Sequence, residues 1–175
     1  AYAASGSLTF TVGAVGLGLS VGASVADNII ENTVDARISG ADVTGASVSL
    51  ASSSEASIEA LAIAAAISAN VSIASLGLAG GGASATNRIH NTIEAGIDSF
   101  GAVTAGGPAG IGNVVLSADD ASFVDADVGS GSFAMGLLAA ASVGVSIAET
   151  VVENSVKAWI GDAVVTATHG DILLT

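Results

Sequence analysis

The chain has 175 residues, enough for one domain, but a third of them are alanine or glycine and only six are aromatic, so any core must pack small side chains closely. Sixteen acidic residues against three basic ones give a net charge of −13, which excludes a nucleic-acid-binding surface and opposes binding to anionic membranes. The absence of cysteine excludes disulfides and thiolate metal sites.

Residues 15–25 form the first strongly patterned segment. Val, Leu or Ala occupies every odd position, and Gly or Ser occupies every even one. Period two is typical of an extended strand, and a face of such small residues predicts a close neighbour on that side. We therefore expect a strand that is covered on both faces.

The next segment, "ENTVDARI" at residues 31–38, alternates in the opposite sense. Asn32 and three apolar residues share the even positions and are expected to point inward, whereas the odd positions are polar or charged. Because the apolar residues change from odd to even positions, the sequence predicts a bend or bulge at residues 27–29.

This phrase recurs as "HNTIEAGI" at 90–97 and as "ENSVKAWI" at 153–160, which indicates a tandem repeat. A Val-Thr pair follows each copy, at residues 43–44, 103–104 and 165–166. The spacing between the three asparagines of the phrase is 59 and then 63 residues, so the repeat is about 60 residues long.

Further downstream, residues 48–60 match residues 114–126, and residues 171–175 begin the same segment a third time. We therefore expect one repeat array over residues 1–175, made of a partial unit at 1–59, a unit at 60–125 and a partial unit at 126–175. A chain that opens in mid-repeat and without Met is expected to be a processed product or a window of a longer protein.

Repeats too small to bury their own faces stack on each other. With strands, stacking predicts an all-β fold: a parallel β-solenoid with wide coils of about 60 residues, two or three sheet layers and a rise of about 4.8 Å per coil. The alternative is an antiparallel β-sandwich or an array of small β-modules. The alanine-rich residues 54–69 also fit a helix, but their repeat partner at 120–136 carries glycines and β-prone residues, which favours a strand.

Stacking would place equivalent side chains above one another. We expect Asn32, Asn91 and Asn154 to form an inward ladder in which each side-chain amide donates to the next. The other interpretation is that each asparagine caps a local turn. The preceding residues, Glu31, His90 and Glu153, are expected to form an outward column.

Three uncharged stretches, residues 1–26, 60–87 and 128–148, are long enough to cross a bilayer as helices. Their period-two pattern, their many Ser and Gly residues and the lack of flanking Lys or Arg argue against this, so we expect no membrane span.

Little in the sequence predicts chemistry. We expect His90 to be a solvated strand residue and His169 to be a turn residue, so we expect that the protein is not an enzyme. The glycine-rich segments 79–84 and 105–112 lack a P-loop lysine. We expect no cofactor, although four aspartates leave a calcium site open: Asp119, Asp120, Asp125 and Asp127.

The run "VGASVADNIIENTVDARISGADVT" at 21–44 and its two echoes resemble the repeats of large secreted bacterial exoproteins of the leukotoxin-family filamentous adhesin type. The resemblance covers essentially the whole chain and rests on repeat style. It implies a secreted, filamentous role at the cell surface or in an extracellular biofilm matrix.

The expected function is thus a structural repeat region of an extracellular bacterial filament or adhesin, which associates with itself or with neighbouring repeats head to tail through strand edges. The alternative is a surface module that recognises a host or matrix glycan or protein through the long loop at residues 98–113.

Overall fold

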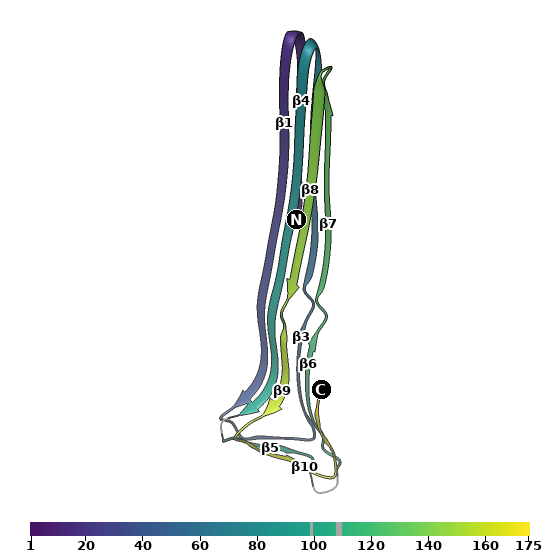
Figure 1. Cartoon of the computed structure of the whole chain (residues 1–175). Helices are drawn as coiled ribbons and strands as arrows, with labels where there is room; N and C mark the ends of the chain where they lie inside the picture. Colours follow the sequence, from purple (N-terminus) through teal and green to yellow (C-terminus); the bar gives the residue numbers. More distant parts are fainter. Residues whose placement is uncertain (99, 108–109) are drawn as a thin grey trace. The chain divides into compact units, whose positions relative to one another are not determined.

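The computed structural model describes residues 1–175 except 99, 108 and 109 (Figure 1). The chain is all-β, with 83% of it in strands and no helix among the described residues. In chain order the strands are β1 (Tyr2–Ser39), β2 (Val43–Gly45), β3 (Val48–Ser54), β4 (Ser57–Asp98), β5 (Ala102–Ala105), β6 (Val114–Asp120), β7 (Phe123–Met135), β8 (Ala139–Val152), β9 (Ser155–Ile160), β10 (Val164–Ala167) and β11 (Ile172–Leu174). The expectation of a strand rather than a helix at residues 54–69 is confirmed.

Within the described part of the chain, the strands form three sheets. One has the order β1-β4-β7, with β8 and β9 also pairing with β4; the others have the orders β10-β5-β2 and β11-β6-β3. The pairs β2–β5, β5–β10, β3–β6, β6–β11 and β4–β9 are all parallel. Parallel sheets are thus the shared feature of the fold, and they are compatible with a β-helix-like solenoid.

The strand register pairs the residues that the repeat alignment equated. Thr104 pairs with Thr44 on one side and with Thr166 on the other. In the next sheet Leu116 lies between Leu50 and Leu174. Equivalent residues of successive repeats therefore lie next to each other in the sheets.

The chain divides into two compact units, and each takes one segment from every repeat. Unit 1 comprises Ala1–Ile29, Ser57–Arg88 and Val124–Val151. Unit 2 comprises Ile30–Ala56, Ile89–Phe123 and Val152–Thr175.

Unit 2 has an ordinary apolar core. Its buried members come from β3, β4, β5 and β6: Val48, Leu50, Ile93, Ala95, Ile97, Val103, Ala105, Val114, Leu116 and Ala118. Val34, Ala36 and Ile38 of β1 pack against this core, so the inward face predicted for residues 31–38 is confirmed for its apolar members. The corner that follows each repeated phrase contains a residue with positive φ, at Gly40, Phe100 and Asp162.

Unit 1 is built from strands that double back. Ser24 Oγ donates to the Ala3 carbonyl oxygen at 2.7 Å, and Thr9 Oγ1 donates to the Leu19 carbonyl oxygen at 2.9 Å, so the two legs of β1 lie side by side. Figure 1 shows the same sharp bend in β4 and between β7 and β8.

The inside of unit 1 is lined mainly by small residues, with Ile58, Asn70 and Asn87 as larger buried members. The even positions of β1 from Gly16 to Ala26 are buried, while the large residues at its odd positions point outward. In the part of β1 that belongs to unit 2 the less exposed positions are again even, apart from Asn32, so no change of face occurs at residues 27–29. The inward positions change from odd to even at the bend of the strand instead, between residues 11 and 16. The predicted bulge at residues 27–29 and the predicted cover over the large apolar face are therefore wrong.

The physical reason for this orientation is the close approach of backbones in unit 1. A Cβ atom at Gly22 would lie 2.5 Å from the carbonyl oxygen of Ala65, and one at Gly81 would lie 2.7 Å from that of Gly131. No side chain fits in these gaps, so glycine allows the legs to meet and the large residues must occupy the other face. The close neighbour predicted for the small face is confirmed.

No helix among the described residues is both long and apolar enough to cross a membrane.

Candidate functional site

A polar cluster in unit 2 surrounds Asn91, which β4 holds in a fully buried position. Its side-chain nitrogen Nδ2 donates to Ser122 Oγ at 3.0 Å, and to Ser54 Oγ and Asp120 Oδ1 at 3.3 Å each. Its Oδ1 atom is buried and has no hydrogen-bond partner. The buried amide therefore depends on hydroxyl and carboxylate groups contributed by β3, β6 and the β6–β7 connection.

Asn154, which precedes β9, completes this cluster. Its Oδ1 accepts the backbone N–H of Asn91 at 2.9 Å, and its Nδ2 donates to Ser122 Oγ at 3.2 Å and to Asp120 Oδ2. Ser122 Oγ in turn donates to Asp120 Oδ1 at 2.8 Å. One carboxylate thus accepts hydrogen bonds from both asparagines and from the serine between them.

The structure brings Asn91 and Asn154 together, but the hydrogen bonds differ from the expected amide-to-amide ladder. Asn32 is exposed. A side-chain amide pair of the expected kind lies in unit 1, where Asn28 Nδ2 donates to Asn87 Oδ1 at 2.8 Å. Asn28 lies within residues 27–29, where the sequence predicts a bulge, and its spacing of 59 residues from Asn87 equals the first repeat spacing.

The outward column is exposed. His90 Nδ1 lies 4.0 Å from Glu153 Oε2, with side chains 55% and 69% exposed, and Glu31 is exposed as well. Ion pairs at such positions contribute little to stability. Neighbouring charges form a denser group around Arg37, which lies 3.1 Å from Asp35, 3.3 Å from Glu94 and over the Trp159 ring.

The four aspartates considered for calcium fall in different units. Asp119 and Asp120 belong to unit 2, where Asp119 accepts from Ser117 Oγ at 3.0 Å, whereas Asp125 and Asp127 belong to unit 1. In the part of the chain that the structure describes, no group of three or more His, Asp or Glu residues is arranged to hold a metal ion.

The loop at residues 98–113 contains all three residues that lie outside the described part of the chain: 99, 108 and 109. Its described part holds β5 and two exposed apolar side chains, Phe100 and Ile111. The register shows that the extra residues of the middle repeat lie between β5 and β6.

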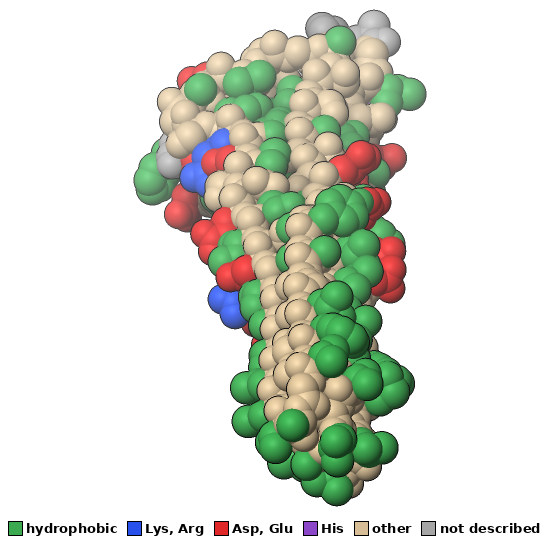
Figure 2. Space-filling view, turned by 90° about the horizontal axis from the view of Figure 1, so that it is seen from above, with side chains coloured by type: hydrophobic (Ala, Val, Ile, Leu, Met, Phe, Trp, Pro, Cys, Tyr) green, Lys and Arg blue, Asp and Glu red, His purple; other side chains and the backbone are tan. Residues whose placement is uncertain are grey.

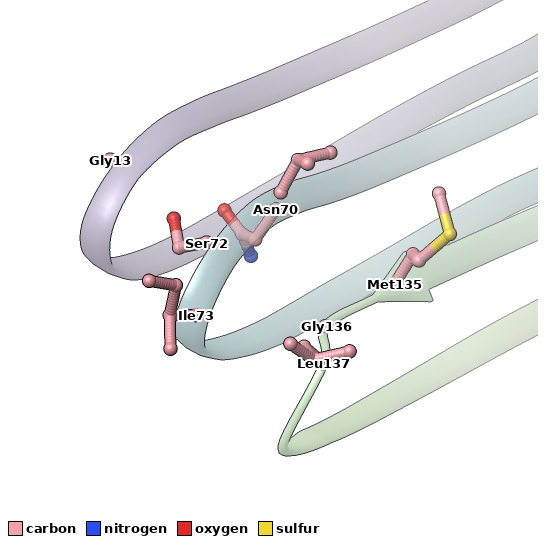
Figure 3. A pocket seen from close by; sticks show the side chains of 8 residues that line it. Gly13, Asn70, Ser72, Ile73, Met135, Gly136 and Leu137 are labelled. Carbon is pink, nitrogen blue, oxygen red and sulfur yellow. The ribbon is translucent and has the colours of Figure 1, made fainter.

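A pocket of about 490 Å³ lies at the bends of unit 1 (Figure 3). It is lined by Gly13, Asn70, Val71, Ser72, Ile73, Met135, Gly136 and Leu137. Figure 3 shows the Asn70 and Ser72 side chains near the bend of β1, and Asn70 Nδ2 donates to the Leu76 carbonyl oxygen at 2.8 Å. No lining residue titrates near neutral pH, so the pocket offers apolar contact rather than acid–base chemistry.

Many large apolar side chains of unit 1 are exposed at the surface. Figure 2 shows projecting rows of hydrophobic side chains over a part of the surface that carries no acidic or basic residue. In unit 1 these outward residues include Leu8, Phe10, Val12, Val15, Leu17, Leu19, Val21, Val25, Ile63, Ile67, Val71, Leu76, Leu78, Phe133, Met135, Val143, Val145 and Ile147, each at least 44% exposed. Monomeric soluble proteins rarely expose apolar patches of such extent.

No protein-family model matches the chain, and no curated protein or solved structure matches it either.

Proposed function

We propose that the chain is a structural repeat region of an extracellular filament or adhesin, built as a β-solenoid with coils of about 60 residues. The observation that carries the proposal is the register: equivalent residues of successive repeats pair in parallel, as Thr44, Thr104 and Thr166 do. A fold in which each repeat templates the next is suited to extension and needs no ligand.

Open strand edges would supply the contacts between repeats. β2 and β10 are the outer strands of one sheet, and β3 and β11 are the outer strands of another. Such edges carry rows of backbone donors and acceptors that pair readily with a further strand. Either another repeat of the same protein or a second copy would continue the sheets in register, without closing the assembly.

A secreted location agrees with the composition. The chain lacks cysteine and carries an acidic, lysine-poor surface, and its repeats resemble those of secreted bacterial adhesins. The exposed Phe100 and Ile111 favour a second candidate function, in which the loop at residues 98–113 recognises a glycan or a protein.

A charge-reversal experiment tests head-to-tail pairing. Thr44 and Thr166 are both exposed, and in-register pairing would bring Thr166 of one copy about 4.8 Å from Thr44 of the next. The double variant Thr44→Asp/Thr166→Asp should raise the concentration needed for assembly, measured by light scattering and electron microscopy. The matched variant Thr44→Lys/Thr166→Asp should assemble as the wild type does.

Equal assembly of the two double variants at low ionic strength would contradict the proposed register. A wild-type chain that stays monomeric at every concentration would rule out extension by separate copies.

A further inference from the structure

The outer faces of unit 1, defined here as the outward positions of its strand segments, lack any partner of matching chemistry within the unit. Val15, Val21 and Leu17 of β1 are 64–80% exposed although the unit buries glycine, serine and alanine. The same holds for both legs of β4, with Ile67 and Leu76 exposed on opposite sides of the bend. Unit 1 is therefore apolar on the outside of both legs.

Two bends of unit 1 expose large apolar side chains as well, next to the small residues Gly13, Ser72 and Gly136. The β4 bend carries Ile73, which is 81% exposed, and the β7–β8 bend carries Leu137, which is 72% exposed (Figure 3). The next residue along the chain, Leu138, is 68% exposed. A hairpin end that faces water normally carries Asn, Asp, Gly or Pro. Bends of this composition are suited to an apolar surrounding.

The uncharged length of each leg can be compared with the thickness of a membrane. From Leu137 back to Asp127 the chain runs ten residues, and from Leu138 on to Glu149 it runs eleven. At about 3.3 Å per residue these legs are about 33–36 Å long, while the hydrocarbon core of a bilayer is about 30 Å thick. The legs of β1 and β4 have at least as many uncharged residues between bend and first charge.

We propose that unit 1 inserts, bends first, into the hydrocarbon region of a zwitterionic lipid bilayer. Acyl chains would cover both faces and the bends at once, whereas a second copy of the chain would cover one face. Backbone groups within hydrocarbon must be paired, and β4 is paired on both sides, by β1 and by β7 and β8. β1, β7 and β8 have β4 on one side only, so the insertion rests on the proposed function, in which a further repeat or an in-register copy pairs their outer edges.

The charges define which lipids suit this insertion. Unit 2 contains 11 of the 16 acidic residues and only two of the three basic ones. Anionic headgroups would repel it. Phosphatidylcholine is therefore favoured over phosphatidylglycerol at low salt.

The test uses the full chain and dioleoyl-phosphatidylcholine vesicles. The wild type should float with vesicles in a density gradient, and Val21→Glu should lower the bound fraction about a hundredfold because a charge enters hydrocarbon. The control Ala51→Glu places the same charge at an exposed position of β3 in unit 2 and should float as the wild type does. Val21→Ser, which adds no charge, should show an intermediate loss.

Depth is measured separately by fluorescence quenching with brominated phosphatidylcholine. A tryptophan introduced by Leu17→Trp in a Trp159→Phe background should be quenched, while native Trp159 of unit 2 should not be. The proposal fails if the wild type stays in the aqueous fraction, if Val21→Glu floats as well as Ala51→Glu, or if Leu17→Trp escapes quenching. A different result would show that a second copy covers these faces: the wild type forms dimers without lipid, Val21→Glu abolishes the dimers, and neither protein binds vesicles. Light scattering of the lipid-free protein reads out head-to-tail assembly by itself, so a chain that assembles but does not bind vesicles contradicts the insertion alone.

Discussion

The close approach of strand legs in unit 1 predicts opposite effects for two glycine-to-alanine substitutions. At Gly22 the new Cβ would lie 2.5 Å from the carbonyl oxygen of Ala65, and the next nearest atoms are also backbone of Ala65. At Gly82 nothing lies within 4 Å of the new Cβ. Both glycines belong to long strands of unit 1, so they differ mainly in the space available.

The magnitudes follow from two terms. Overpacking against backbone costs about 1–3 kcal/mol, because whole strands must separate rather than one side chain rotate. Alanine also restricts the unfolded chain and thereby stabilises the folded state by about 0.4–1 kcal/mol. We therefore expect Gly22→Ala to lose about 1–2 kcal/mol and Gly82→Ala to gain about 0.5 kcal/mol.

Urea unfolding followed by circular dichroism, together with calorimetry, measures both changes. In a chain of this size 1 kcal/mol shifts Tm by about 2–4 °C, so Gly22→Ala should lower Tm by about 3–6 °C and Gly82→Ala should raise it slightly. Gly81→Ala, whose Cβ would lie 2.7 Å from the Gly131 carbonyl oxygen, is a second test in another pair of strands and should resemble Gly22→Ala. Equal shifts for Gly22→Ala and Gly82→Ala would refute the inward orientation of the small residues.

Three further predictions concern unit 2. Asn91→Leu should lower the free energy of unfolding by about 1–3 kcal/mol in urea titrations, because three hydrogen-bond acceptors lose their donor, while the exposed Asn32→Leu should change it by less than about 0.5 kcal/mol. Asp120→Asn should lower the free energy of unfolding by about 1–2 kcal/mol because its carboxylate accepts hydrogen bonds from three side chains. The same change at the exposed Asp119 should be nearly neutral. Similar urea midpoints of unfolding for the two variants would argue against the cluster. Arg37→Ala should lower the free energy of unfolding by about 1 kcal/mol in low salt and by less in 1 M NaCl, because Arg37 contacts carboxylates and an aromatic ring at the surface. A loss of stability that does not depend on salt would show that packing dominates.

Strand positions and their pairing could be predicted from the sequence because both depend on local periodicity and on repeats. The Val-Thr pairs and the match of residues 48–54 with 114–120 reappear residue by residue in the register. Parallel pairing of repeats demands this, since equivalent side chains favour equivalent neighbours.

The direction of each face could not be predicted as readily. Alternation gives the period of a strand but not which face lies inside, and the large apolar face was assumed to be buried because burial of large side chains is favourable. One signal pointed the other way: no even position from Gly16 through Ile38 is charged, whereas Asp27, Glu31, Asp35 and Arg37 all stand at odd positions. A strand without a bulge turns its even positions inward over this length, glycine and serine included, although Asn32 remains exposed.

The polar cluster was missed for a related reason. Asn91 could be identified from the repeats, but its partners Ser54, Asp120 and Ser122 come from the opposite strands, and repeat spacing carries no information about distances across the interior. A partial signal existed, because the alignment equated Ser54 with Asp120 and the structure pairs these two residues.

The two units therefore derive their stability from different sources. Unit 2 removes isoleucine, leucine and valine side chains from water, whereas the interior of unit 1 consists of residues that bury little area each. Unit 1 must depend on paired backbone groups and on close contact between strand legs, while its large side chains add no burial until something covers them. Any partner that covers the outer faces binds only the folded unit, so it adds its binding free energy to the stability of that unit. A strand that places glycine inside and leucine outside thereby makes folding and surface attachment mutually reinforcing.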